Sequence, residues 1–217
     1  MKLTTTLNLI RACSPCSSGW RTLNEALGSE FDPDEEINLL EILDTNGVQD
    51  MLWCLRTTKQ DSRKIASQLA IEFANQALPI FEARMPNDQR PRKAIQAARD
   101  FNAGKITKEE LMASRRAAAD AADAAAFVSS AAVVAADASY VASDADAAAD
   151  ASDAAASYAV ASYVASYAAV VAADAAVTAA YADADAYADA AACADADAAL
   201  RKAQEKQAEI IRSILEV

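Results

Sequence analysis

Residues Thr107–Ala126 read TKEELMASRRAAADAADAAA and predict the structure of the second half of the chain. Thr107 and Glu110 match a capping box, in which the two side chains satisfy backbone N–H groups at a helix start. No helix breaker follows, because the four Gly and five Pro of the chain all lie at or before Gly104. Alanine has the highest helix propensity. Helix is therefore the secondary structure expected from Lys105 to the C-terminus.

The alanine-rich region could be one rod or several helices. A continuous helix over residues 105–217 would be about 170 Å long. Residues 143–153 and 182–189 are rich in Ser and Asp, which are good N-caps and poor helix interiors. The octapeptide AAVVAADA occurs at Ala131–Ala138 and again at Ala168–Ala175, an offset that suits a helix–turn–helix repeat. We expect antiparallel helices folded back on one another, while the repeat could also be a product of low complexity.

The first 104 residues predict a head of short helices. Gly28 is placed to end a helix, and the turn Asp44–Gly47 separates two apolar segments. The expected helices are Ser18–Leu27, one that starts in the acidic stretch FDPDEE (31–36) and carries Leu39–Leu43, Val48–Arg56, one from Asp61 to Leu78, a new first turn at Pro79, and Arg92–Asn102.

The sequence thus predicts an all-α fold with two parts. A short-helix N-terminal head covers residues 1–104, and an Ala/Asp-rich helical body of antiparallel helices, a bundle or a helical-hairpin repeat, covers residues 105–217. The amphipathic helix expected over Leu200–Val217 carries Ile and Leu on one face, and we expect it to pack back on the body.

Negative charge is concentrated in one segment of the chain. The net charge is −12, yet residues 117–199 contain 13 Asp and no Glu, Lys or Arg, so the remainder carries only +1. Such a segment repels nucleic acid and anionic membranes and attracts basic surfaces. The candidate partner-binding residues on this acidic face are Asp137, Asp144, Asp146, Asp150, Asp153, Asp174, Asp183, Asp185, Asp189, Asp195 and Asp197.

The spacing of these charges depends on how the segment folds. Duplex DNA presents one charge per about 1.7 Å of axis. Thirteen Asp on a straight helix over residues 117–199 would give one charge per roughly 10 Å. In three or four antiparallel helices of roughly 30–40 Å, the same charges fall at one per about 2–3 Å. Nucleic-acid mimicry therefore requires a compact bundle.

Catalytic and metal-binding signatures are missing from the sequence. The chain has no His, no Gly-rich phosphate loop and no nucleophile elbow. Asp pairs two residues apart point about 200° apart on a helix and cannot converge for acid–base work. Cys13 and Cys16 have zinc-ligand spacing, but Cys54 is the only further ligand nearby. We expect a protein that is not an enzyme, with reduced thiols, no cofactor and no metal.

No segment of the chain predicts export or a membrane span. The N-terminal residues lack an uninterrupted apolar run, which a signal peptide needs. Ala154–Ala173 is uncharged and long enough to span a bilayer, but it has no Leu, Ile or Phe and is flanked by Asp153 and Asp174. The expected location is the cytoplasm.

Three stretches of the chain have a recognisable pattern: Arg11–Trp20 (RACSPCSSGW), Ile42–Arg56 (ILDTNGVQDMLWCLR) and Leu78–Ile106 (LPIFEARMPNDQRPRKAIQAARDFNAGKI). They resemble a family of alanine-rich phage and bacterial proteins labelled immunity proteins. An alanine-rich tract and a C-terminal amphipathic helix extend the likeness over nearly the whole chain. The relatives interleave Trp, Arg and Asp in that tract, whereas this chain has Tyr, Ser and Asp there. The resemblance implies a role in conflict between phage, bacterial host and toxin, and it carries over no catalytic residues.

Two functions follow from these patterns. The first is non-catalytic inhibition of a protein partner with a basic surface, such as a nuclease, a toxin or a host-defence component, without direct nucleic-acid or membrane binding. The alternative is an assembly module whose alanine-rich tract drives self-association into a homo-oligomer. A single acidic face would favour inhibition, and Asp scattered around a Tyr/Val seam would favour assembly.

Overall fold

The computed structural model describes residues 2–124 and 189–216. These residues form eight α-helices, one 3-10 helix and a sheet of two very short strands. The all-α class expected from the sequence is confirmed. The antiparallel helices and the repeat expected within residues 125–188 lie outside the described residues.

A minimal sheet ties the first residues to the segment before the third helix. Strand β1 (Thr4–Thr5) pairs antiparallel with β2 (Ile37–Asn38), and helix α1 (Leu7–Ala12) follows β1 directly. The sequence did not predict these strands, because two residues are too few for an alternating apolar pattern. The pairing buries Ile37 completely and sets the start of the next helix.

The next helices lie close to the predicted ranges, but the helix expected over Val48–Arg56 ends at Cys54 and a 3-10 helix follows it. These helices are α2 (Ser17–Leu27), α3 (Leu39–Asn46), α4 (Val48–Cys54) and the 3-10 helix η1 (Leu55–Thr57). Gly28 and Gly47 end α2 and α3 with φ of 85°, a conformation that favours glycine. The prediction that a helix starts in the acidic stretch was wrong. β2 intervenes, and the Asn38 side chain instead caps α3 by accepting from Leu40 N at 3.1 Å.

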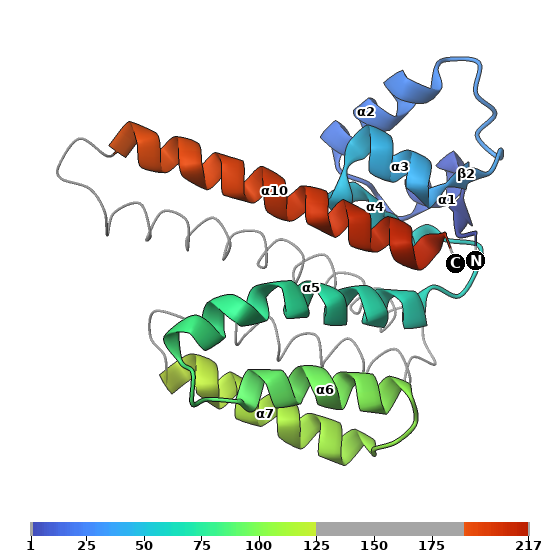
Figure 1. The fold of residues 1–217 in the computed structure, drawn as a ribbon. Coiled ribbons are helices and arrows are strands. Elements are labelled where there is room, and N and C mark those ends of the chain that lie inside the picture. Colours follow the sequence, from blue (N-terminus) through green and yellow to red (C-terminus); the bar gives the residue numbers. More distant parts are fainter. Residues whose placement is uncertain (1, 125–188, 217) are drawn as a thin grey trace.

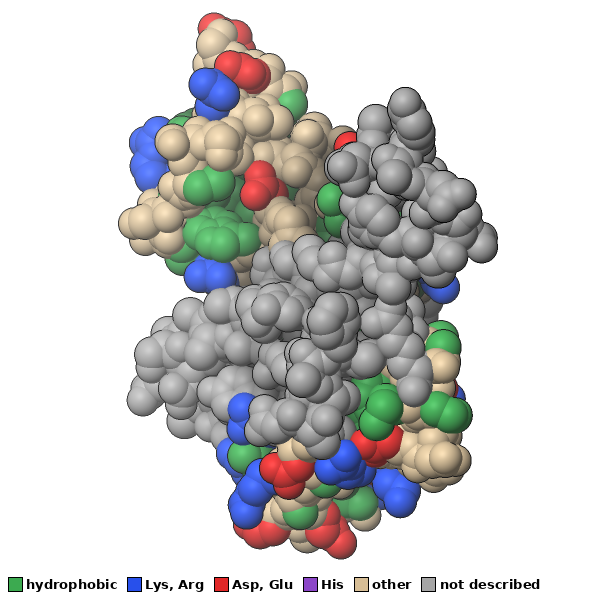
Figure 2. Space-filling model, turned by 90° about the vertical axis from the view of Figure 1, so that its left-hand side faces the viewer, with side chains coloured by type: hydrophobic (Ala, Val, Ile, Leu, Met, Phe, Trp, Pro, Cys, Tyr) green, Lys and Arg blue, Asp and Glu red, His purple; other side chains and the backbone are tan. Residues whose placement is uncertain are grey.

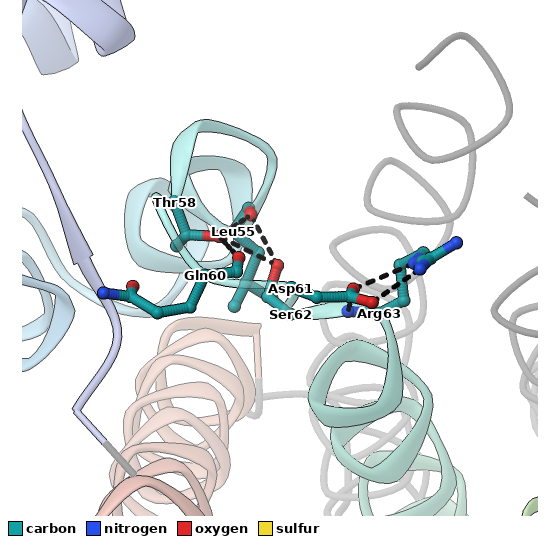
Figure 3. A network of polar contacts seen from close by, with 6 residues as sticks. All are labelled: Leu55, Thr58, Gln60, Asp61, Ser62 and Arg63. Atoms are coloured by element: carbon teal, nitrogen blue, oxygen red, sulfur yellow. Dashed lines mark hydrogen bonds and ion pairs between the residues drawn. The ribbon is translucent and has the colours of Figure 1, made fainter. Parts of the chain in front are cut away.

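A hydroxyl network closes the turn between η1 and the next helix, α5 (Arg63–Arg84) (Figure 3). Thr58 Oγ1 lies 2.9 Å from the Leu55 carbonyl oxygen and 3.0 Å from Ser62 Oγ, and Ser62 Oγ donates to the same carbonyl at 2.7 Å. Asp61 was expected to cap the following helix, and Asp61 Oδ1 accepts from Arg63 N, the first residue of that helix, at 3.1 Å, although Ser62 occupies the N-cap position. The Asp61 carboxylate also pairs with the Arg63 guanidinium at 2.5 Å, and this contact lowers the pKa of the Asp61 carboxyl to about 2.

Helix α5 (Arg63–Arg84) is longer than the sequence suggested. The expected new helix start at Pro79 was wrong, because α5 runs through this residue. A proline inside a helix costs roughly 3 kcal/mol. Leu78 and Phe81 on either side of it are buried, and each fully buried apolar side chain contributes about 1.5–3 kcal/mol. Their burial is enough to offset the proline.

Two helices form a hairpin after the loop that holds Pro86–Asp88. They are α6 (Arg90–Asn102) and α7 (Lys108–Ala124). The capping box at the start of α7 is confirmed: Glu110 N donates to Thr107 Oγ1 at 3.3 Å, and Thr107 N donates to Glu110 Oε2 at 2.8 Å. Ala94 and Ala118 are fully buried between the two helices, which their small side chains allow to approach closely.

Helix α10 (Asp189–Leu215) returns to the N-terminal part of the chain. Figure 1 shows it running between α3 and α4 on one side and α5 on the other, with the two chain ends close together. Packing on the body was expected, but Ile211 and Leu215 are buried in one core with residues of α3, α4 and α5. Leu111 of α7 joins the same core, so a single straight rod over residues 105–217 is excluded. The boundary at 104/105 stays a prediction.

The docking of α10 predicts a specific loss of stability. Replacing Ile211, which has no exposed surface, by Ala should lower the free energy of unfolding by about 2–5 kcal/mol. Urea unfolding should be followed by tryptophan fluorescence, since both tryptophans lie in the head, on α2 and α4. Exposed Glu209→Ala is the control and should stay within about 0.5 kcal/mol of the parent. An unchanged midpoint for Ile211→Ala would contradict the shared core.

Candidate functional site

The predicted acidic face falls mostly outside the part of the chain that the structure describes. Three of its carboxylates, Asp189, Asp195 and Asp197, lie on α10, and Asp197 is exposed. Asp120, near the end of α7, is also exposed. The remaining predicted residues, Asp137, Asp144, Asp146, Asp150, Asp153, Asp174, Asp183 and Asp185, lie outside the described residues.

Helices α7 and α10, which contain the two ends of the acidic segment, both pack against the core of the head. On one side, the capping box fixes the start of α7, and Leu111 is fully buried. On the other side, Gln76 Nε2 of α5 donates to the Ala203 carbonyl of α10 at 3.1 Å, and Arg212 pairs with Asp44 of α3 at 2.6 Å. The acidic segment thus begins and ends on helices packed against the same structure.

The described surface outside this segment carries both signs of charge. Figure 2 shows Lys and Arg beside Asp and Glu at the end of the molecule formed by α6 and α7. Arg92 of α6 makes two contacts of 2.6 Å with Glu82, and Arg99 reaches Glu72 at 3.0 Å. These contacts neutralise basic residues locally, so the charge imbalance remains a property of residues 117–199.

A second candidate site is a cavity of about 70 Å³ between α1, α2, α3 and α4. Its walls are mostly apolar, and they contain both tryptophans of the chain and two of its cysteines. The lining residues are Ile10, Pro15, Cys16, Gly19, Trp20, Leu23, Ile42, Asn46, Asp50, Trp53 and Cys54.

One carboxylate is fixed in the wall of this cavity. Asn46 Nδ2 donates to Asp50 Oδ2 and to the Gly19 carbonyl oxygen, both at 2.8 Å, and so joins α2, α3 and α4. A Cβ at Gly19 would lie 2.4 Å from Asp50 Oδ2, so only glycine lets the carboxylate approach α2 this closely. The expected turn over Asp44–Gly47 is shorter than predicted: Asp44–Asn46 form the end of α3, and Gly47 alone separates α3 from α4. Asn46 has a positioning role at this junction.

An arginine side chain lies over the ring of each tryptophan of the cavity. The guanidinium of Arg11 lies 5.1 Å from the centre of the Trp20 ring, and that of Arg56 lies 4.9 Å from the centre of the Trp53 ring. These are cation–π distances. Trp53 is half-buried and packs against the core.

The three cysteines of the head differ in environment. Cys13 and Cys16 are exposed, and Cys16 Sγ caps α2 by accepting from Gly19 N at 3.3 Å. Cys54 is buried, and burial, together with the negative charge of Asp50, raises the pKa of its thiol to about 12.

Among the described residues, no three His, Cys, Asp or Glu side chains are grouped as a metal site. In the same part of the chain, no helix is long and apolar enough to cross a membrane, and Ala154–Ala173 lies outside it.

The sequence did not predict this cavity. Trp20 and Asp50 come from different helices, and each alone has an ordinary explanation as a packing residue or a surface charge. The available signal was indirect: Arg11 and Arg56 lie close in sequence to Trp20 and Trp53, and both pairs fall within the stretches that resemble immunity proteins.

Comparison of the chain with protein-family models, curated proteins and solved structures finds no match. The resemblance to alanine-rich immunity proteins therefore stays a prediction.

The cysteine environments predict an order of chemical modification. At pH 8 a thiol with a pKa of about 12 is ionised in about one molecule in ten thousand, so Cys54 should resist alkylation by iodoacetamide in the folded protein. Exposed Cys13 and Cys16 should react first. Peptide mapping by mass spectrometry gives the order, and labelling in urea is the control in which Cys54 should react as well. Equal rates in the folded protein would contradict the burial of Cys54.

Proposed function

We propose that this protein is a non-catalytic acidic binding protein that neutralises a partner protein with a basic surface. The observation that carries this proposal is the segregation of charge. Residues 117–199 carry 13 negative charges and no positive ones, while the other residues nearly cancel. Opposite potentials steer association and suppress wrong partners. A nuclease, a toxin or a host-defence component that binds nucleic acid has the kind of surface this segment would occupy.

The described ends of the segment support this proposal. Helices α7 and α10 pack on one core, and the Asp residues described on their exposed sides, Asp120 and Asp197, are open to solvent. Preorganised charges cost less to order on binding than charges on a free chain. A head that holds both ends of an acidic segment can therefore act as its scaffold. Nucleic-acid mimicry is the form of inhibition that such a scaffold favours.

The choice of Asp over Glu also favours binding. Asp has the lower helix propensity, by up to about 0.5 kcal/mol per site, so thirteen Asp without Glu do not serve helix stability. A shorter side chain has fewer rotatable bonds to immobilise when its carboxylate meets a cation. An array of Asp therefore lowers helix stability, and its carboxylates lose less side-chain entropy when they bind a cation.

The test is binding at low and high salt. Partners captured by the immobilised protein from bacterial lysate should be eluted with salt, identified, purified and then studied by surface plasmon resonance. Association should slow steeply between 0.1 M and 1 M salt, where the Debye length falls from about 10 Å to about 3 Å. Changing Asp144, Asp146, Asp150 and Asp153 together to Asn should slow association by about tenfold or more, with helicity in circular dichroism nearly unchanged.

A control variant distinguishes the effect of charge in the acidic segment from the effect of the net charge of the protein. Glu30, Glu35, Glu41 and Glu109 are exposed carboxylates outside the acidic segment, and changing all four to Gln alters the net charge equally. This variant should bind like the parent. If the fourfold Asn variant binds as tightly as the parent at low salt, the acidic segment is not the binding face, and residues 56–63 and 88–92 of the head become the place to search. An oligomer that persists at 1 M salt in light scattering would favour the assembly alternative.

A further inference from the structure

We propose that the cavity between α1, α2, α3 and α4 binds a small alkylammonium group, with Asp50 as counter-ion and the rings of Trp20 and Trp53 as walls. This site is independent of the acidic segment and of the function proposed above. The group could belong to a free methylated amine or to the end of a lysine side chain, since both present the same chemistry.

The one formal charge in the described walls of the cavity is negative, so a charged ligand that pairs with the wall would be a cation. Asp50 is the only charged residue among the described residues that line the cavity. The thiol of Cys54 stays neutral, because burial raises its pKa to about 12. The bond from Asn46 uses one of the roughly four lone-pair positions of the Asp50 carboxylate, which leaves acceptor capacity for an N–H donor or a close methylammonium group.

The aromatic walls favour an organic cation over a metal ion. Indole rings attract cations through their negative faces, and alkylammonium groups are the ligands best suited to such sites. Arg11 and Arg56 already lie over these two rings and do not line the cavity. Hydrated metal ions such as Ca²⁺ require six to eight oxygen ligands, and most of these walls are carbon.

The size and burial of the cavity fit a headgroup. One water needs about 10–15 Å³ of such space, so about 70 Å³ admits a group of a few heavy atoms and no large ligand. Ile10, Leu23 and Ile42 in the wall are buried, with exposures of 3% or less. An ion pair with Asp50 beside these side chains is screened less than one on the open surface.

The position of Asp50 is built into the fold. It lies in the first turn of α4, where a negative charge is favourable, and Asn46 holds its carboxylate against α2 at Gly19. Gly19→Ala would place a methyl group 2.4 Å from Asp50 Oδ2 and displace the carboxylate. The site therefore predicts that this methyl group weakens cation binding without any change of charge.

Tryptophan fluorescence of the full-length protein tests the proposal directly, because both tryptophans of the chain line the cavity. Tetramethylammonium chloride and n-butylammonium chloride should each be titrated at constant ionic strength against sodium chloride. A saturable change in emission with either ammonium salt is expected, and the tighter of the two identifies a methylated amine or a lysine-like group. No saturable change with either salt would overturn the proposal.

Controls separate charge from simple cavity filling. tert-Butyl alcohol resembles tetramethylammonium in shape but is neutral, and an equal response to it would overturn the proposal. Asp50→Asn keeps an oxygen that accepts from Asn46 and removes the charge, so it should weaken ammonium binding at least tenfold. Glu41→Gln, an exposed change on α3, should leave binding unchanged. Equal binding by Asp50→Asn would exclude the counter-ion role.

A measurement on the unmodified protein covers the case in which Asp50→Asn does not fold. Saturation-transfer NMR should carry magnetisation from the indole protons to the methyl protons of tetramethylammonium or to the chain of n-butylammonium. Absence of transfer to both would overturn the proposal. Because the acidic segment takes no part in this experiment, its outcome leaves the proposed partner binding untouched, and loss of partner binding would leave the cavity site untouched.

Discussion

The burial of helix α10 in the core of the head determines how the described N-terminal and C-terminal parts of the chain are arranged. Ile211 and Leu215 share one apolar core with side chains of α3, α4 and α5, and Leu111 enters the same core from α7. A straight helix from residue 111 to residue 211 would separate its ends by about 150 Å. The shared core therefore forces the chain between them to return, and it brings the chain ends together, as Figure 1 shows.

The parts of the fold that could be predicted from the sequence are those with a local physical signal. The capping box at Thr107 and the glycines that end α2 and α3 act through atoms a few residues apart, so composition and spacing suffice to find them. The pairing of β1 with β2 depends on residues more than thirty positions apart and has no repeating pattern. Pro79 indicated a helix boundary, and burial of its neighbours overrode that local rule.

The candidate sites also differ in how much of each can be predicted from local sequence. Charge segregation can be counted in the sequence, but its arrangement in space depends on packing between helices. The cavity depends on Gly19 and Asp50, which approach each other only after α2, α3 and α4 have packed. Asn46 is the residue that links these helices, and nothing in its neighbours in sequence marks it for that task.

The two parts of the chain differ in side-chain size, and the head holds most of the large buried side chains. The largest fully buried side chains of the described residues, among them Phe73 and Phe81, lie almost entirely before residue 112, whereas residues 117–199 are dominated by Ala. Stabilisation scales with the apolar area removed from water, and a methyl group removes little. Alanine secures helical backbone without supplying much of a core, and repulsion among thirteen carboxylates opposes compaction. Leu111 on α7 and Ile211 and Leu215 on α10 attach the described helices at both ends of this segment to the core, although none of the three carries charge.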